Sequence, residues 1–393
     1  MTRLRPRRYR DKIGRMMERI KDMGLKHFAI AVAVIASLGV GGAFYFLAQG
    51  QVRVKSEPTF TIGGTPASEM PGSGKTAAGG PLPKQKLLSS GYHVFQTFNN
   101  CAAAGLSIAL SYYDIHISQE KLAAKLRPNN NLQGLDDDKS TPPQELAAEA
   151  QARGLVAYHR GGGDIDTLKR LLAAGHPVLI RTLLNSYEDF AHYRVVRGYD
   201  EARGVIIQDD SYQGKDKAYT YAEWNAIWKP FNYAYVVLAS PKDKAEVEAA
   251  LGESKDAKAS WRKAIRIAEG ELAKNPNDTK ARFNLATAYF YLGDYERTVA
   301  EFEKVEKSLA RRTMWYQMEP IEAYSKLGNH ARVFSLSDRI LNDGNRGYSE
   351  LYLLKGKSYQ AQGKLDLARE QFELALRYHK NSAAAKAALA SLE

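Results

Sequence analysis

The chain of 393 residues has a single cysteine, Cys101, and lacks the common motifs of metal and nucleotide sites. One thiol cannot close an internal disulfide or form a cysteine-only zinc site, so a disulfide-stapled secreted scaffold is excluded. The eight histidines show no metal-ligand spacing such as H-E-x-x-H, and no phosphate-binding G-x-x-x-x-G-K-[ST] occurs. The glycine run at 161–163 is expected to be a loop. The sequence therefore predicts no metal and no cofactor.

Acidic residues are the minority, because 44 Asp and Glu stand against 56 Lys and Arg, a formal net charge of +12. The surplus is uneven. Residues 1–26 hold ten Lys and Arg and three Asp and Glu, a net +7, which leaves only +5 for the other 367 residues. A basic body of the kind that binds nucleic acid is therefore not predicted.

Long apolar runs are rare, and the one that stands out extends from Phe28 to Ala48, 21 residues without a charge. At about 1.5 Å per residue, a helix of this length crosses the hydrocarbon core of a bilayer, about 30 Å thick. We expect residues 27–48 to be a single transmembrane helix rather than a buried helix of a soluble domain. The long basic region before it and the lack of a clean A-x-A site favour an uncleaved signal anchor over a cleaved signal peptide.

The charge distribution also predicts the orientation of this anchor. The Lys and Arg excess lies entirely on its N-terminal side. By the positive-inside rule, residues 1–26 are cytoplasmic and the C-terminal domains are extracytoplasmic, either periplasmic or on the cell surface. Residues 49–86, with seven glycines and five prolines and no helical or strand period, predict a flexible tether between membrane and domains.

Residues 87–241 are expected to form an α+β domain in which a helical half precedes a β half. The sequence Thr141-Pro142-Pro143-Gln144 indicates a capping-box-like helix start, with proline at the first helical position. The patterns predict helices at 101–114, from the start at Thr141 to 153, and at 165–174, and strands at 178–181, 193–199, 205–209 and 233–239.

Residues 242–393 contain a repeat, because Gly293, Gly328 and Gly363 recur at a spacing of 35 residues. Tyrosines and small residues recur around these glycines, and the pattern resembles the tetratricopeptide repeat (TPR). The resemblance implies an all-α superhelix of stacked helix pairs. The middle unit is degenerate, since Pro320 falls within its first helix. By analogy of architecture we expect the concave face to bind a peptide or a partner protein, with a helical spacer as the alternative.

Cys101 begins the helical pattern CAAAGLSIALSYYD, with Asn100 as the expected N-cap. A thiolate in the first turn is stabilised by the helix N-terminus, which lowers the thiol pKa and makes the sulfur nucleophilic. Such a nucleophile needs a base, and the base needs an orienting group. His192 opens the strand pattern HYRVVRGYD, and Asp209 lies at the end of GVIIQDD. Gln96, five residues before the cysteine, is the candidate oxyanion donor.

The phrases QTFNNC, GHPVLI, HYRVVRGYD and VIIQDD together resemble the peptidase-like relatives of the bacteriocin-processing (double-glycine leader) peptidases. This group is cysteine peptidase family thirty-nine, in the papain-like clan. The resemblance implies a papain-like fold with Cys101 as nucleophile, His192 as general base and then acid, Asp209 as orienter and Gln96 as oxyanion donor. The family usually has Gly-Pro after the cysteine, where this chain has two alanines. The closing aspartate of the family is usually followed by proline, whereas Asp209 is followed by Asp210. Both Asp209 and Asp210 therefore remain candidates for the group that orients the imidazole.

Three functions agree with these observations. The first is a membrane-anchored extracytoplasmic thiol peptidase, whose acyl-thioester leaves hydrolysis and transpeptidation both open and whose peptide or protein substrates are recruited by the repeats. The second is a catalytically silent papain-like and TPR scaffold that binds partner proteins at the membrane. The third is self-release by cleavage at the paired glycines of the tether, Gly63-Gly64 and Gly79-Gly80.

Overall fold

The structure is a computed structural model, which describes residues 81–89, 92–128 and 141–393. The predicted cytoplasmic stub, the predicted transmembrane helix and most of the predicted tether lie outside these ranges. Within them, no helix is long and apolar enough to cross a membrane. The described residues all belong to one compact unit. The last two residues of the predicted tether, Gln85 and Lys86, belong to a strand of the sheet.

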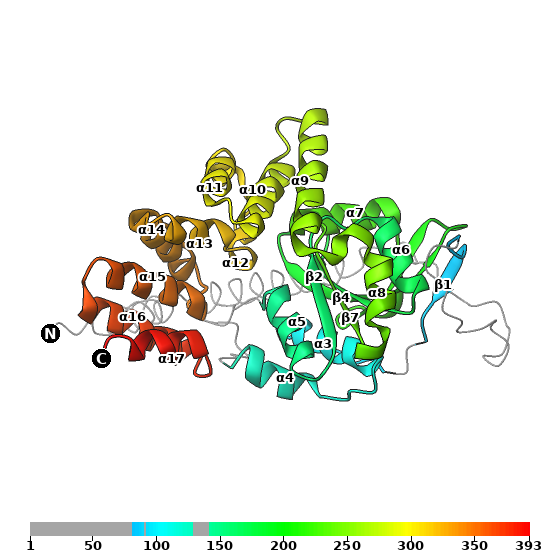
Figure 1. Cartoon of the computed structure of the whole chain (residues 1–393), viewed down its shortest axis with the longest axis horizontal. Coiled ribbons are helices and arrows are strands. Elements are labelled where there is room, and N and C mark those ends of the chain that lie inside the picture. Colours follow the sequence, from blue (N-terminus) through cyan, green and yellow to red (C-terminus); the bar gives the residue numbers. More distant parts are fainter. Residues whose placement is uncertain (1–80, 90–91, 129–140) are drawn as a thin grey trace, which may run out of the picture. The chain divides into compact units, whose positions relative to one another are not determined.

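The first half of this unit is an antiparallel sheet with helices on both faces (Figure 1). The seven strands run in the order β2-β7-β3-β4-β5-β6, and β1 pairs with β4 beside this path. The strands are β1 Gln85–Leu87, β2 Val156–Arg160, β3 Val178–Leu183, β4 Ala191–Asp200, β5 Val205–Asp210, β6 Gly214–Thr220 and β7 Tyr235–Ala239. The helices are α3 Cys101–Ser111, α4 Gln119–Leu126, α5 Pro143–Gln151, α6 Ile165–Ala173, α7 Tyr221–Trp228 and α8 Lys244–Leu251.

Alternation along the strands divides the core of this half into two layers, because successive side chains point to opposite faces. Leu179 and Val195 pack with α3, α4 and α5. Val178 and Ile180 pack with α6, α7 and α8. The central strands are buried on both faces, which is why they read as apolar runs in the sequence. The predicted α+β class is confirmed.

The predicted helices and strands of this half are present, with differences at their ends. The capping box expected at Thr141 is wrong: Pro142 is the N-cap of α5, and no side-chain capping bond is made there. The helix therefore begins one residue later than predicted, with Pro143 rather than Pro142 at the first helical position. The sequence interpretation missed α4, α7, α8, β1, β2 and β6. Strand β2 lies in the half that was expected to be helical and pairs with β7 at one end of the sheet.

The second half is helical, and most of its helices pack on a neighbour along the chain (Figure 1). Gly293, Gly328 and Gly363 end the first helices of the three units in the left-handed conformation, with φ of +83°, +69° and +71°. Pro320 lies in the first turn of α13, where its missing N–H costs little. The helices are α9 Ala257–Lys274, α10 Thr279–Leu292, α11 Tyr295–Glu303, α12 Thr313–Tyr316, α13 Glu319–Lys326, α14 His330–Asn342, α15 Ser349–Ala361, α16 Leu365–Tyr378 and α17 Ala383–Ala390. Short 3₁₀ turns lie at Lys229–Phe231, Pro241–Asp243, Gly252–Lys255 and Glu306–Ser308.

Candidate active site

Cys101 is the first residue of α3, as predicted, and lies at a cavity of about 410 Å³. Asn100 occupies the N-cap position but makes no side-chain capping bond. Its amide Nδ2 instead donates to Thr97 Oγ1 at 2.8 Å. Gln96 and His192 line the same cavity. The structure therefore brings together three of the four residues that the sequence singled out.

The thiol of Cys101 and the imidazole of His192 are hydrogen-bond partners. Burial raises the pKa of the thiol, but the hydrogen bond and charge of His192, the backbone N–H of Tyr193 and the charge of Arg127 together bring the Cys101 pKa below its ordinary value. Burial lowers the pKa of the imidazole, but Asp210 and then Cys101 outweigh it, so the His192 pKa is raised. Both directions favour a thiolate beside an imidazolium.

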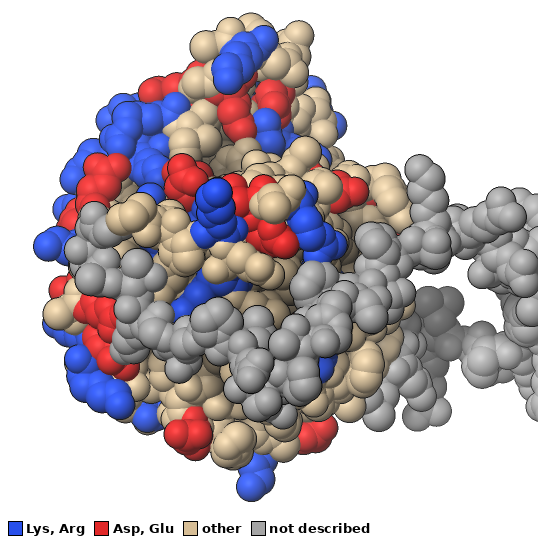
Figure 2. Space-filling view, turned by 90° about the vertical axis from the view of Figure 1, so that its right-hand side faces the viewer, with Lys and Arg blue, Asp and Glu red and all other residues tan. Residues whose placement is uncertain are grey.

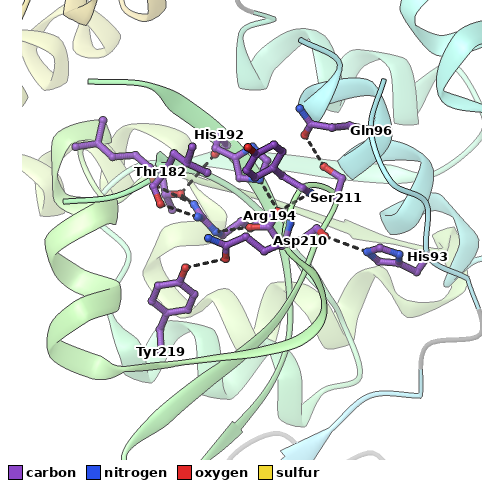
Figure 3. A network of polar contacts seen from close by, with 12 residues as sticks. His93, Gln96, Thr182, His192, Arg194, Asp210, Ser211 and Tyr219 are labelled. Carbon is purple, nitrogen blue, oxygen red and sulfur yellow. Dashed lines mark hydrogen bonds and ion pairs between the residues drawn. The ribbon is translucent and has the colours of Figure 1, made fainter. Parts of the chain in front are cut away.

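Asp210 is the carboxylate that holds the imidazole (Figure 3). Its Oδ1 lies 2.7 Å from His192 Nε2 and also accepts backbone N–H groups from Tyr212 at 2.7 Å and Gln213 at 3.0 Å. Because Nε2 is engaged in this way, Nδ1 is the ring nitrogen left for the thiol. Burial raises the pKa of Asp210, but His192 and then Arg194 outweigh it and hold the Asp210 pKa well below its usual range.

Arg194, which the sequence interpretation missed, pairs with the Asp210 carboxylate through the oxygen that does not contact His192. It is fully buried, and its Nε lies 3.0 Å from Asp210 Oδ2 in an ion pair. Its Nη1 and Nη2 each donate at 2.9 Å to the carbonyls of Leu183 and Leu184, and Nη1 also contacts Thr182 Oγ1. The alternation in HYRVVRGYD puts Arg194 on the face of His192, which is the signal that could have identified it.

Asp209, named first from the sequence as the orienter, has other partners. Its Oδ1 accepts from Arg197 Nε at 3.0 Å and from the Asp216 backbone N–H at 3.1 Å. The structure thus gives the contact with the imidazole to Asp210, the alternative that the sequence left open.

A β-bulge explains why Asp210, rather than Asp209, contacts His192. At Arg197 the pairing of β4 with β5 shifts by one residue. Beyond the bulge, Asp210 lies opposite Arg194, which is two residues after His192, so all three side chains share one face of the sheet. Continued pairing without the bulge would have placed Asp209 on that face instead.

Gln96 is fixed through its backbone and its amide oxygen. Its backbone N–H donates to the carbonyl of Ser211 at 2.8 Å, and Ser211 Oγ donates to Gln96 Oε1 at 2.9 Å. The amide oxygen is therefore turned to Ser211, and the amide nitrogen is turned away from it (Figure 3). Both residues flanking Gln96 are held by a buried side chain that the sequence missed, since Gln119 donates to the Phe95 carbonyl at 2.8 Å and accepts from the Thr97 N–H at 2.9 Å.

The residues at the Cys101 cavity combine the groups of a nucleophilic site. Within the described ranges, no three His, Cys, Asp or Glu side chains gather as metal ligands. A polarised thiol, a base held by a carboxylate and an amide donor at one cavity are the parts that nucleophilic catalysis requires. On the face drawn in Figure 2, basic and acidic side chains are interspersed.

Comparison with known proteins agrees with both halves of the fold. Residues 84–236 match the model of the Peptidase_C39 like family. Residues 279–308 and 349–382 match the tetratricopeptide repeat, while the degenerate middle unit falls between them. The chain thus carries a C39-like peptidase domain followed by TPR repeats, and the predicted resemblance is confirmed. No curated protein matches the chain.

The solved structures similar to this chain include three peptidases or peptidase domains, all at low identity. A putative C39-like peptidase from Bacillus anthracis is 17% identical, with 40% of this chain and 98% of that chain covered and a TM-score of 0.33. A double glycine motif protease from an AMS/PCAT transporter, in complex with the leader peptide, is 17% identical, with 39% and 93% covered and a TM-score of 0.29. The peptidase domain of Streptococcus ComA is 18% identical, with 39% and 98% covered and a TM-score of 0.31.

Proposed function

We propose that this chain is a membrane-anchored, extracytoplasmic thiol peptidase whose TPR repeats bring peptide or protein substrates to Cys101. The observation that carries the proposal is the chain of contacts from the Cys101 thiol through His192 to Asp210, at the edge of an open cavity. The lowered pKa of the thiol and the raised pKa of the imidazole support the reactive ion pair.

In the acylation step, the Cys101 thiolate adds to the carbonyl carbon of the scissile peptide bond. The charge that develops on the carbonyl oxygen is stabilised by the Gln96 amide and the Cys101 backbone N–H. The C–N bond then breaks as the His192 imidazolium gives its proton to the departing amine. An acyl-thioester and a neutral imidazole remain.

In the deacylation step, His192 takes a proton from a water molecule whose oxygen adds to the thioester carbonyl. The C–S bond breaks, the acid product leaves, and the thiolate and imidazolium are restored. An amine in place of water would give a new peptide bond, so the same site serves hydrolysis or transpeptidation. Asp210 stays ionised throughout and holds the imidazole in position.

The first test is the pH dependence of Cys101 alkylation by iodoacetamide. Since the chain has one cysteine, the label reports on this thiol alone. We expect a thiol pKa well below the ordinary value of about 8.5, and a rise toward that value in His192→Ala. Cleavage of a peptide mixture that is abolished in Cys101→Ala then identifies the activity.

The opposite result has an equally definite meaning. A slowly reacting thiol whose pKa does not respond to His192→Ala would contradict the proposed enzyme. The chain would then be the catalytically silent scaffold, and partner binding by the repeats would be its function.

The anchor is proposed from the sequence and has its own test. Cells that express the full chain should retain it in carbonate-washed membranes, and deletion of residues 27–48 should release it. Protease added outside spheroplasts should digest the domains after residue 49 and spare an N-terminal tag. A tag that is digested from outside would contradict the predicted orientation.

A further inference from the structure

A second cavity, of about 570 Å³, lies beside the one at Cys101. Glu188, Phe190 and Tyr316 line both cavities, so the two are adjacent. The walls of the second cavity come from both halves of the described unit. The β3–β4 loop and the turn at Lys229–Phe231 form one side, and helices α10 and α12 of the repeat half form the other.

The loop segment between the two cavities is fixed by contacts with a residue of the repeat half. Arg312, next to α12, donates from its Nη1 to Asp189 Oδ1 at 2.7 Å and from its backbone N–H to Asp189 Oδ2 at 3.1 Å. Its guanidinium also lies 4.1 Å from the ring centre of Phe190. Asp189 and Phe190 belong to the loop that leads directly into His192 on β4. The repeats therefore contact the loop that borders the candidate active site.

Exposed aromatic side chains gather at these cavities. Among the described residues, five aromatic side chains are exposed: Tyr187 by 84%, Phe95 by 64%, Tyr212 by 63%, Phe98 by 48% and Phe190 by 46%. All of these except Phe95 line one cavity or both. Exposed aromatic clusters of this kind mark binding surfaces.

We propose that the second cavity is a substrate subsite that takes a large apolar side chain, lying within a few residues of the cleaved bond, and that the repeats complete this subsite. The proposal rests on the proposed function, because it assigns the occupant as the same peptide that Cys101 attacks. The adjacency of the two cavities is the argument for a peptide, since an extended chain that leaves the thiol can pass over the shared residues Glu188, Phe190 and Tyr316 into the second cavity. The apolar lining from Leu183, Phe231 and Phe283 sets the chemistry of the anchor side chain.

The test uses two substitutions, each of which fills the second cavity with a large side chain from a different wall. Ser186→Trp, on the β3–β4 loop, and Ala310→Trp, before α12, both replace exposed lining residues, so neither change disturbs the core. The full chain digests a peptide library made from a trypsin-cut bacterial proteome, and mass spectrometry locates the cleaved bonds. We expect Leu, Phe, Tyr or Trp to be enriched at one fixed substrate position, which lies a few residues from the cleaved bond and not directly next to it.

Each filled variant should lower kcat/KM for peptides with that anchor by about tenfold or more, as in other apolar pockets, and spare peptides with alanine there. Cys101 alkylation should stay as in the wild type. Ala361→Trp, at the exposed end of α15 and away from both cavities, is the matched control and should cleave like the wild type. Cleavage without an apolar preference, or a preference that survives both filled variants, would overturn the subsite.

If no peptide is cleaved, the proposed function fails and the cavity is tested by binding. Fluorescein-labelled decapeptides of Gly, Ser and Ala, with or without one central Phe, are titrated into the full-length Cys101→Ala chain. Binding that is about tenfold tighter with Phe and is lost in Ala310→Trp supports the subsite. Equal binding of the two peptides overturns it.

Discussion

Asp209 and Asp210 are neighbours with the same kind of partner and different proposed tasks. Each carboxylate is buried and paired with an arginine of β4, but only Asp210 contacts His192. Asp209→Asn and Asp210→Asn are therefore a matched pair. Asp210→Asn should cost about 3–5 kcal/mol of stability, because Arg194 loses the carboxylate it is paired with. Asp209→Asn should cost less, because Arg197 keeps its ion pair with Asp216. Only Asp210→Asn should also lower kcat, by about 10²-fold or more, measured below the melting temperature of both variants. Equal losses of kcat would contradict the assignment.

The oxyanion role of Gln96 can be separated from activation of the thiol. Gln96→Ala removes a donor from the cavity without touching the contact between Cys101 and His192. We expect kcat to fall about 10²–10³-fold while the rate of Cys101 alkylation is unchanged. Ser211→Ala, which frees the amide oxygen of Gln96, should give a smaller loss of kcat because the amide donor remains. Slower alkylation in Gln96→Ala would show that this residue acts on the thiol instead.

The pKa shifts of the site also fix the pH dependence of activity. The reactive ion pair forms as pH rises through the lowered pKa of Cys101 and is lost as pH rises through the raised pKa of His192. The acid limb of kcat/KM should therefore lie below the ordinary thiol pKa. In Asp210→Asn the alkaline limb should move to lower pH, because the carboxylate that raises the His192 pKa is gone. An unmoved alkaline limb would contradict this coupling.

At the scale of elements, the sequence predicted those features that depend on a local pattern of residues. The start of α3, the strand that begins near His192 and the repeat glycines all depend on residues close in the chain. The position of Asp210 depends on a bulge at Arg197, and nothing local to VIIQDD reports a register shift in the neighbouring strand. The strands β2 and β6 were missed because both lie at ends of the sheet order and are only partly buried, so they lack the apolar signal.

The close packing of the last repeat has a direct test. Gly356 in α15 contacts Phe372 in α16 so closely that an added Cβ would lie 2.3 Å from the ring. Gly356→Ala should therefore cost about 1–3 kcal/mol of unfolding free energy by overpacking. Gly270→Ala in α9 is the matched control, because an added Cβ there meets nothing within 4 Å, and it should gain up to about 1 kcal/mol in helix propensity. Urea unfolding measures both, and a neutral Gly356→Ala would contradict the tight contact.

At the scale of the whole molecule, the two halves are joined by buried polar contacts at Asn232. Its side-chain Nδ2 donates to the Asn284 carbonyl at 2.7 Å and to Thr287 Oγ1 at 3.0 Å, both in α10. Its backbone N–H donates to Asn284 Oδ1 at 3.1 Å, and its φ of +59° is left-handed. A buried residue with this backbone and these partners couples the peptidase-like half to the repeats, and the proposed subsite depends on that coupling.

Replacement of Asn232 tests whether the halves act as one body. Asn232→Gly keeps the left-handed backbone accessible and removes only the side-chain bonds, which should cost about 1–3 kcal/mol. Asn232→Ala adds strain at positive φ and should cost more. We expect calorimetry of the full chain to show one main transition in the wild type and two in Asn232→Ala, as the peptidase-like half and the repeats unfold separately. If the subsite is shared, the same variant should lose its apolar cleavage preference at temperatures where both halves remain folded. Separate transitions with an intact apolar cleavage preference would mean that the peptidase-like half alone determines specificity and that the repeats only recruit the substrate.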